Sequence, residues 1–252
     1  MTSLLPSLDH PRIVRLGSRA AVRRAAGTLD AIIVATSEDA GERVFDELPE
    51  PDRWRDLRLR SPVRAGDVRT TTLANERQTL AALGFLRAKA SAFETATLAG
   101  RLLKEAAARK PATLGIFAPG GGAQAAGILD ALLQAALAHA FPLPSFRTAP
   151  RRGERLRSIA IPAGPALDVR YASAASRGNN LARWLTALPP NKLDATAYRR
   201  LIASMARERG IGMRWLDEQA LRRLGANAFL AVSAGNAQRT AGIAHLRYRP
   251  RA

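Results

Sequence analysis

The chain has 252 residues, of which 47% are apolar and 24% are charged. This composition is typical of a globular protein and excludes a largely disordered chain, and the length suits one or two domains. The absence of cysteine excludes disulfides, thiolate zinc sites and cysteine nucleophiles. Because no run of 18 apolar residues and no signal-peptide pattern occurs, we expect a cytoplasmic protein that has no membrane partner.

The charge is strongly positive and unevenly distributed. The formal net charge is +18, yet the first 50 residues hold six Arg and eight acidic residues, so an excess of 20 positive charges follows residue 50. Almost all of the basic residues are Arg, since only four are Lys. Two interpretations stay open: a face that binds a polyanion, or a high-GC genome, which enriches Arg and Ala together.

The first third of the chain alternates short apolar runs with turns. The polar segment 37–66 is interrupted by Pro49, Pro51 and Pro62, and we expect it to be mostly loop, with a short helix near 42–48. The apolar runs predict strands at 13–14, 31–35, 68–73 and 79–86.

The clearest helix signal begins at Ser91. Ser91 and Glu94 have the spacing of a capping box, in which each side chain accepts a hydrogen bond from a free backbone N–H of the other. A helix is therefore predicted over 91–109. Its expected apolar face consists of Phe93, Ala96, Gly100, Leu103 and Ala107.

A strand, a glycine turn and a second helix follow, an order typical of α/β proteins. The strand is predicted at 113–118, the turn at 119–122 and the helix at 123–140. After an Arg-rich link at 147–157, further strands are expected at 156–161, 211–216, 229–232 and 243–248. Helices are expected at 172–188, at 195–209 with Asp194 as its N-cap, and at 218–224.

Two small groups of residues remain as candidate binding sites. Gly120, Gly121 and Gly122 precede a helix, where free N–H groups can hold a phosphate, although glycines also serve simply to turn the chain. The densest basic patch is Arg147, Arg151, Arg152, Arg155 and Arg157, candidates for nucleic-acid contacts. The three histidines are isolated and the acidic residues are scattered, so no catalytic centre and no metal site are visible.

Three ordered blocks near the C-terminus resemble the leucyl aminopeptidase family, also called cytosol aminopeptidases. The first is Asn180–Asn191, which is similar to a connecting helix that ends in Pro-Pro-Asn. The second is the helix 195–209 with the strand Met213–Glu218, and the third is Leu224–Gly235, whose pattern is Leu-Gly, then Leu-Ala-Val, then Gly. Ile243–Tyr248 then resembles the strand that precedes the family's catalytic core.

The resemblance implies an α/β fold with a macrodomain-like N-terminal domain at 1–171, a connecting helix at 172–189 and the beginning of the catalytic domain at 190–252. For the full-length family member it implies two divalent metals (manganese or zinc), peptide substrates and a homo-hexamer. The family's metal-binding motif, similar to Gly-Lys-Gly-x-x-Phe-Asp, is missing from this sequence, so no catalytic or metal residue carries over. We therefore expect a truncated aminopeptidase that is inactive alone.

Two alternatives stay open beside the aminopeptidase fragment. The chain could be a basic module that binds DNA through the arginines of the 147–157 link. It could also be a macrodomain-like binder of a nucleotide or ADP-ribose, with Gly120–Gly122 at the phosphates.

Overall fold

A computed structural model describes residues 5–146, 156–162, 167–235 and 240–249. The chain divides into two compact units, one formed by Ser7–Leu181 and one that contains Ala182–Ala252. Helix α5 (Val169–Ala187) passes through this division. The domain limits expected from the sequence, at residues 171 and 189, stay a prediction.

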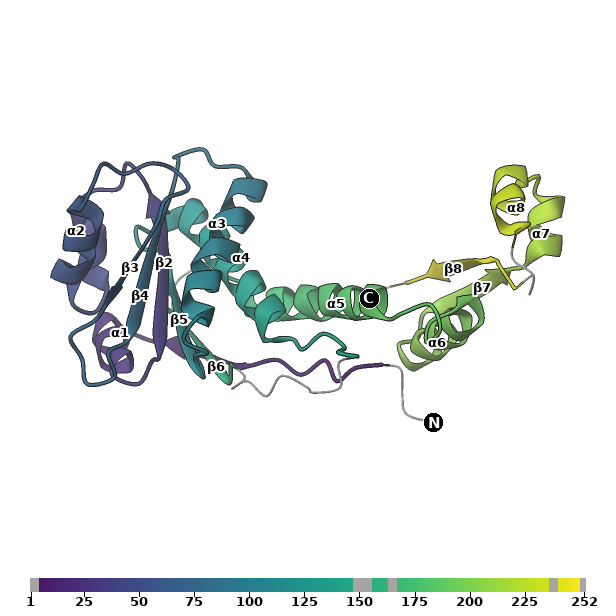
Figure 1. Ribbon diagram of the computed structural model, residues 1–252, viewed down its shortest axis with the longest axis horizontal. Helices are drawn as coiled ribbons and strands as arrows, with labels where there is room; N and C mark the ends of the chain where they lie inside the picture. The colour runs from purple at the N-terminus through teal and green to yellow at the C-terminus, as the bar shows by residue number, and fades with distance from the viewer. Residues whose placement is uncertain (1–4, 147–155, 163–166, 236–239, 250–252) are drawn as a thin grey trace. The chain divides into compact units, whose positions relative to one another are not determined.

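The first unit is built on one mixed β-sheet, which confirms the α/β class. In the described part of the chain its strands lie in the order β1-β6-β5-β2-β4-β3 (Figure 1). Only β3 runs antiparallel to its neighbour, and the other pairs are parallel. The strands are β1 (Arg12–Leu16), β2 (Ala31–Ser37), β3 (Val68–Thr72), β4 (Leu80–Leu86), β5 (Thr113–Phe117) and β6 (Ser158–Pro162).

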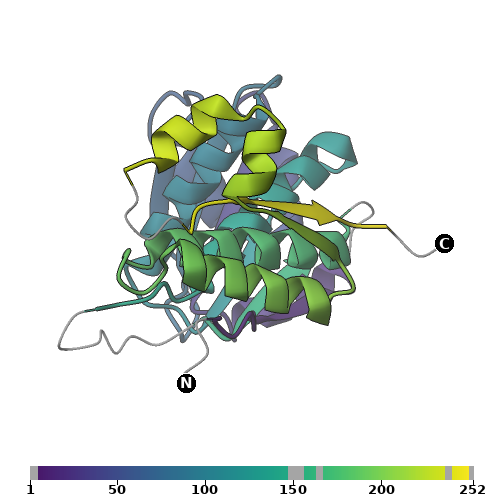
Figure 2. The same cartoon turned by 90° about the vertical axis from the view of Figure 1, so that its right-hand side faces the viewer.

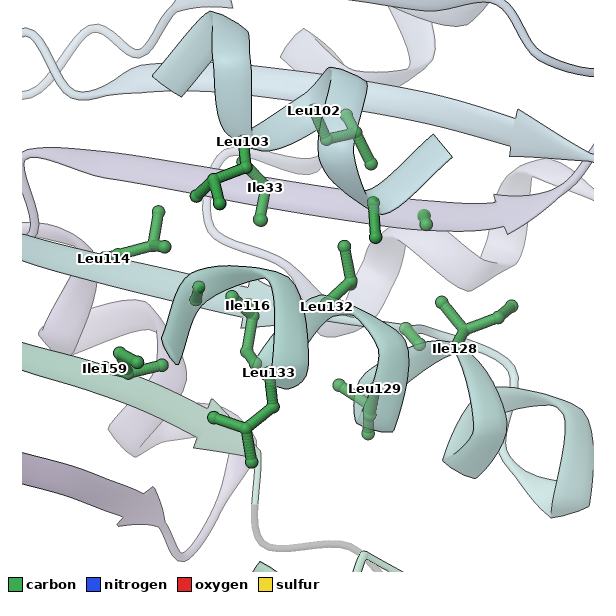
Figure 3. Packing of buried hydrophobic residues seen from close by; sticks show 14 of the residues in the cluster. Ile33, Leu102, Leu103, Leu114, Ile116, Ile128, Leu129, Leu132, Leu133 and Ile159 are labelled. Carbon is green, nitrogen blue, oxygen red and sulfur yellow. The ribbon is translucent and has the colours of Figure 1, made fainter. Parts of the chain in front are cut away.

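Helices cover both faces of this sheet. On one face lie α1 (Arg19–Ala26), the 3-10 helix η1 (Glu42–Glu47) and α2 (Pro51–Leu59), and on the other lie α3 (Ala92–Ala107) and α4 (Gly122–Ala140) (Figure 1). A hydrophobic core lies on each face of the sheet, and the side chains of β2 alternate between the two cores. Ile33 packs with α3 and α4, whereas Ile32 and Val34 pack on the opposite face. Figure 3 shows the α3–α4 core, in which Leu102, Leu132 and Leu133 meet Ile33 and Ile116.

Two helices of the first unit lie where the sequence predicted none. Helix α1 is short and rich in Arg, and of its described side chains only Val22 and Ala26 are buried, so its apolar period is too sparse to detect. The prediction of mostly loop over 37–66 was wrong at α2. Pro51 is the first residue of that helix, where its fixed φ fits and its missing N–H is not needed.

The capping box at Ser91 is confirmed, but the predicted apolar face of α3 is wrong in part. Glu94 N donates to Ser91 Oγ over 3.2 Å, and Ser91 N donates to Glu94 Oε2 over 2.8 Å. Phe93 is 80% exposed, and the residues that α3 buries are Leu98, Ala99, Leu102, Leu103 and Ala106. This stripe lies about one residue position away from the predicted one, a rotation of roughly 100° about the helix axis.

In its described residues, the second unit contains a small antiparallel sheet and three helices that follow α5 (Figure 2). Strand β7 (Gly212–Leu216) pairs with β8 (Ile243–Arg247), and the helices are α6 (Ala195–Glu208), α7 (Glu218–Arg223) and α8 (Asn227–Ser233). The strand predicted at 229–232 is wrong, because those residues form most of α8. A four-residue apolar run has no period that separates a strand from a buried helix turn. No helix in the described residues is long and apolar enough to cross a membrane.

Candidate functional site

The glycine turn joins the carboxyl end of β5 to the start of α4. Gly120, Gly121 and Gly122 have φ angles of +103°, +69° and +76°, a region that residues with a Cβ rarely adopt. Three glycines in a row are therefore required by the backbone path itself. The turn ends at the N-terminus of a 19-residue helix, where the partial positive charge of the helix favours an anion. Anion binding at this turn stays a prediction.

A cavity of about 210 Å³ lies beside this turn, at the carboxyl edge of the parallel strands. The chain leaves β2 toward η1 on one face of the sheet and leaves the neighbouring strand β5 toward α4 on the other face. Diverging connections of this kind open a crevice in α/β sheets, and ligands usually bind there. The lining residues are Leu16, Ser18, Val22, Glu47, Leu48, Phe117, Ala118, Pro119 and Pro162.

The chemistry of the cavity suits a neutral or apolar group better than a phosphate. Its walls are mainly apolar, and the Ser18 hydroxyl already accepts a hydrogen bond of 3.1 Å from the backbone N–H of Ala21. Glu47 is the ionisable residue in the lining, and a carboxylate repels an anion. The cavity could not be found from the sequence, but Ser18, an N-cap directly after a strand, was a signal for one of its walls.

The predicted arginine patch lies almost entirely outside the described residues, since Arg147, Arg151, Arg152 and Arg155 fall there. Arg157 is described, and its side chain is exposed. Its backbone joins three segments: its N–H donates to Ala112 O over 2.7 Å, and its carbonyl accepts from Arg12 N over 2.9 Å. The structure thus shows a backbone role for Arg157, and the contacts of the five arginines with nucleic acid stay a prediction.

The ionisable side chains of the first unit are mainly structural. Asp30 accepts hydrogen bonds of 2.9 Å from the N–H groups of Ala112 and Thr113 and from the Thr113 hydroxyl, and so joins the start of β2 to β5. Burial acts to raise the pKa of Asp30, but the hydrogen bonds from Thr113 and Ala112, with Arg77 nearby, outweigh it and lower this pKa. Such a carboxylate is fully engaged in holding strands together.

No group of three or more His, Cys, Asp or Glu residues that could hold a metal ion occurs in the described part of the chain. Two of the histidines belong to the first unit: His10 is near its start, and His139 is in the last turn of α4. The third, His245, is in β8 of the second unit. The His, Asp and Glu residues of the described chain therefore do not fit the two-metal centre that the resemblance implies for a full-length aminopeptidase.

Comparison with known proteins identifies the family. The model of the cytosol aminopeptidase family's catalytic domain matches residues 180–252. The probable cytosol aminopeptidase of Parasynechococcus marenigrum is 31% identical over 179 residues, which cover 70% of this chain and 37% of the relative. The chain belongs to the cytosol aminopeptidase family.

Solved structures of this family share the fold. A tomato leucine aminopeptidase mutant matches with a TM-score of 0.72 and 18% identity, over 96% of this chain and 52% of that one. The bottromycin maturation enzyme BotP, solved with Mn, matches with a TM-score of 0.55 and 21% identity, over 82% of this chain and 43% of that one. This family member therefore spans about a third of the curated relative and about half of the solved chains.

Membership of the cytosol aminopeptidase family confirms the resemblance found in the sequence. The first block, Asn180–Asn191, begins in the last part of α5, and the second block forms α6 and β7. The third block, Leu224–Gly235, contains α8, so it folds as a helix rather than as the strand that its apolar run predicted.

Proposed function

We propose that this chain supplies the N-terminal domain and the first layer of the catalytic domain of a metal-dependent leucyl aminopeptidase. The whole enzyme removes N-terminal residues from peptides, with two divalent metals, manganese or zinc, that polarise the peptide carbonyl and activate water. The ligands for those metals lie in the part of the family's catalytic domain that this chain does not contain. The chain alone is therefore inactive as a peptidase.

The observation that carries this proposal is the extent of the match. The catalytic-domain model matches only 180–252, and the chain spans 37% of its curated relative. The exposed apolar side chains of the second unit also support it. Leu224, Leu246 and Val232 are 65%, 47% and 88% exposed, as expected for a domain whose remaining strands and helices are missing. A sheet of two strands is also marginally stable by itself.

The direct test is hydrolysis of leucine amide by the purified chain with added Mn²⁺ or Zn²⁺. We expect leucine release no faster than in a metal-free blank, whereas a full-length leucine aminopeptidase in the same assay releases leucine. Metal-dependent release by this chain would overturn the proposal. A sequence similar to Gly-Lys-Gly-x-x-Phe-Asp in the DNA downstream of codon 252 would support it independently.

A cytoplasmic location and a homo-hexameric parent form part of the same proposal. The relatives that support the location are described as cytosol aminopeptidases. The proposed macrodomain-like character of the first unit rests on its six-stranded mixed sheet with helices on both faces.

A further inference from the structure

A further cavity of about 210 Å³ lies in the first unit, beside helix α3. Its floor is apolar, because the side chains of Leu86, at the end of β4, and Leu98, in α3, are buried. The rest of its lining comes from the loop before β3, the turn after β4 and the first turns of α3: Ala65, Gly66, Arg87, Ala90, Phe93, Glu94, Thr97 and Arg101. An apolar cavity of roughly 150 Å³ holds a benzene ring, so this hollow, called the α3 cavity below, has room for one aromatic ring.

Phe93 gives the α3 cavity an aromatic wall. It lies in the first turn of α3, outside the buried stripe of that helix, and its side chain is 80% exposed. A single exposed apolar residue needs no explanation by itself. Here, however, the ring borders a cavity with an apolar floor, and aromatic rings pack favourably on one another in offset or edge-to-face arrangements. Phe93 therefore favours an aromatic group over an aliphatic one in this cavity.

Arg101 places a positive charge at the α3 cavity. Its Nη1 donates a hydrogen bond to the carbonyl oxygen of Gly66, which also lines the cavity, and this bond holds the guanidinium in place. A guanidinium has five N–H donors, so several remain for a ligand. Within the described residues, no carboxylate forms an ion pair with Arg101. Its charge is therefore not neutralised by a neighbouring side chain of the described chain.

The other two ionisable residues of the lining neutralise each other. Arg87 Nη2 lies 2.8 Å from Glu94 Oε2, and Glu94 also caps the start of α3 together with Ser91. With Arg101, the lining holds two arginines and one glutamate, which leaves one positive charge. A ligand with one negative charge balances this lining, whereas a cation is repelled by Arg101.

We propose that the α3 cavity binds an aromatic monocarboxylate. The ring packs between Phe93 and the floor of Leu86 and Leu98, and the carboxylate accepts hydrogen bonds from the guanidinium of Arg101, whose planar fork matches a carboxylate. A free arylacetic acid and the C-terminal phenylalanine of a peptide share this chemistry, and the test below separates these two sources. The site is separate from the glycine turn before α4 and does not depend on the proposed peptidase role.

The test measures binding to the whole chain by ¹H–¹⁵N NMR, with phenylacetate as the probe. For a ligand of about ten non-hydrogen atoms we expect a Kd of about 0.1–10 mM. The backbone N–H signals of Phe93, Thr97 and Arg101 should shift and reach saturation. Phenylacetamide, which keeps the ring but lacks the charge, should bind at least about tenfold more weakly. Absence of saturation up to roughly 20 mM phenylacetate, or shifts confined to residues outside the cavity, would overturn the proposal.

Two matched pairs of variants separate the cavity from net charge and from surface apolarity. R101Q removes the guanidinium at the cavity, whereas R109Q removes another exposed arginine that donates to a backbone carbonyl, that of Gln78 over 3.0 Å, outside the cavity. F93A removes the aromatic wall, whereas F146A removes a phenylalanine that is 60% exposed and does not line the cavity. We expect about tenfold weaker phenylacetate binding by R101Q and about three- to tenfold weaker binding by F93A, with both controls within about twofold of the wild type.

A peptide probe distinguishes the two sources of the ligand. Binding of N-acetyl-Gly-Phe that is lost in its C-terminal amide supports the α3 cavity as a site for a peptide C-terminus, and binding of phenylacetate alone supports it as a site for a free acid. Equal losses in R101Q and R109Q, or equal binding of phenylacetate and phenylacetamide, would overturn the proposal, because Arg101 would then not hold the carboxylate. The ¹H–¹⁵N spectrum of each variant separates a loss of binding from a loss of fold.

Discussion

The ring of Trp215 in β7 packs directly over the backbone of Gly242, which precedes β8. A Cβ at position 242 would lie 2.6 Å from the carbonyl oxygen of Leu216 and closer still to the Trp215 ring. Both neighbours belong to β7, so neither backbone nor ring can move away without disturbing the pairing of β7 with β8. Gly242 is thus needed for the close approach of the two strands.

Substitution of Gly242 by Ala should destabilise the second unit. We expect a loss of about 1–3 kcal/mol in the free energy of unfolding, the usual cost of forcing an extra group into a packed site. Urea unfolding followed by circular dichroism measures this change. Gly235→Ala is the matched control, because a Cβ at position 235 meets nothing within 4 Å. Equal stabilities of the two variants would contradict the close packing of Trp215 on Gly242.

The glycine turn before α4 offers a second matched pair. Gly121→Ala places a Cβ at a φ of +69°, with open space around it, so backbone strain alone should cost about 1–2 kcal/mol. Gly127→Ala lies inside α4, also with open space, and should stabilise the helix by roughly 0.5–1 kcal/mol. Thermal unfolding of both variants checks the opposite signs. A stabilising Gly121→Ala would show that the turn does not have the left-handed conformation.

The capping box predicts a specific titration. The Glu94 carboxylate accepts hydrogen bonds from the Ser91 backbone N–H, from Arg87 and from the Ser91 hydroxyl. Together these donors lower the pKa of Glu94 from 4.5 to about 2. Because the folded pKa is the lower one, the stabilisation is present above pH 4.5 and is lost as the pH falls toward 2. Glu94→Gln should therefore make the free energy of unfolding depend less on pH between about 2 and 4.5. Titration of the Glu94 carboxyl by NMR with a midpoint near 4.5 would show that the box does not form in solution.

Most elements of the fold could be predicted from the sequence, because their apolar residues follow a regular period. The helix 123–140 is such a case, whereas the strand 31–35 is predicted from a continuous apolar run, and the structure buries both elements as these patterns indicate. The failures have local causes. Among the described side chains of α1, only Val22 and Ala26 are buried. Helix α2 begins at a proline in a polar segment, and α8 has an apolar run that is too short to show a period.

The candidate sites were less accessible to sequence reasoning, because they depend on which strands become neighbours. The glycine turn was visible, since three glycines before an apolar helix indicate a left-handed backbone. The cavity beside it joins residues from β1, η1, β5 and β6, which lie far apart along the chain. The α3 cavity likewise joins residues 65 and 66, which precede β3, to α3, and neither segment specifies this contact alone.

We propose that residues 190–252 form an incomplete part of a catalytic domain, while the first unit has a complete core. In the first unit, β2 and β5 are covered on both faces, and residues 31–35 and most of 113–118 are buried. In the second unit, β7 and β8 pair only with each other in the described residues, and several apolar side chains stay exposed.

Hydrogen–deuterium exchange with mass spectrometry measures this difference directly, because slow exchange requires stable, buried hydrogen bonds. We predict fast exchange across peptides from 190–252 and slow exchange in peptides that contain 31–35 and 113–118. Uniform protection across both units would show that the C-terminal segment is a complete domain and would contradict the claim.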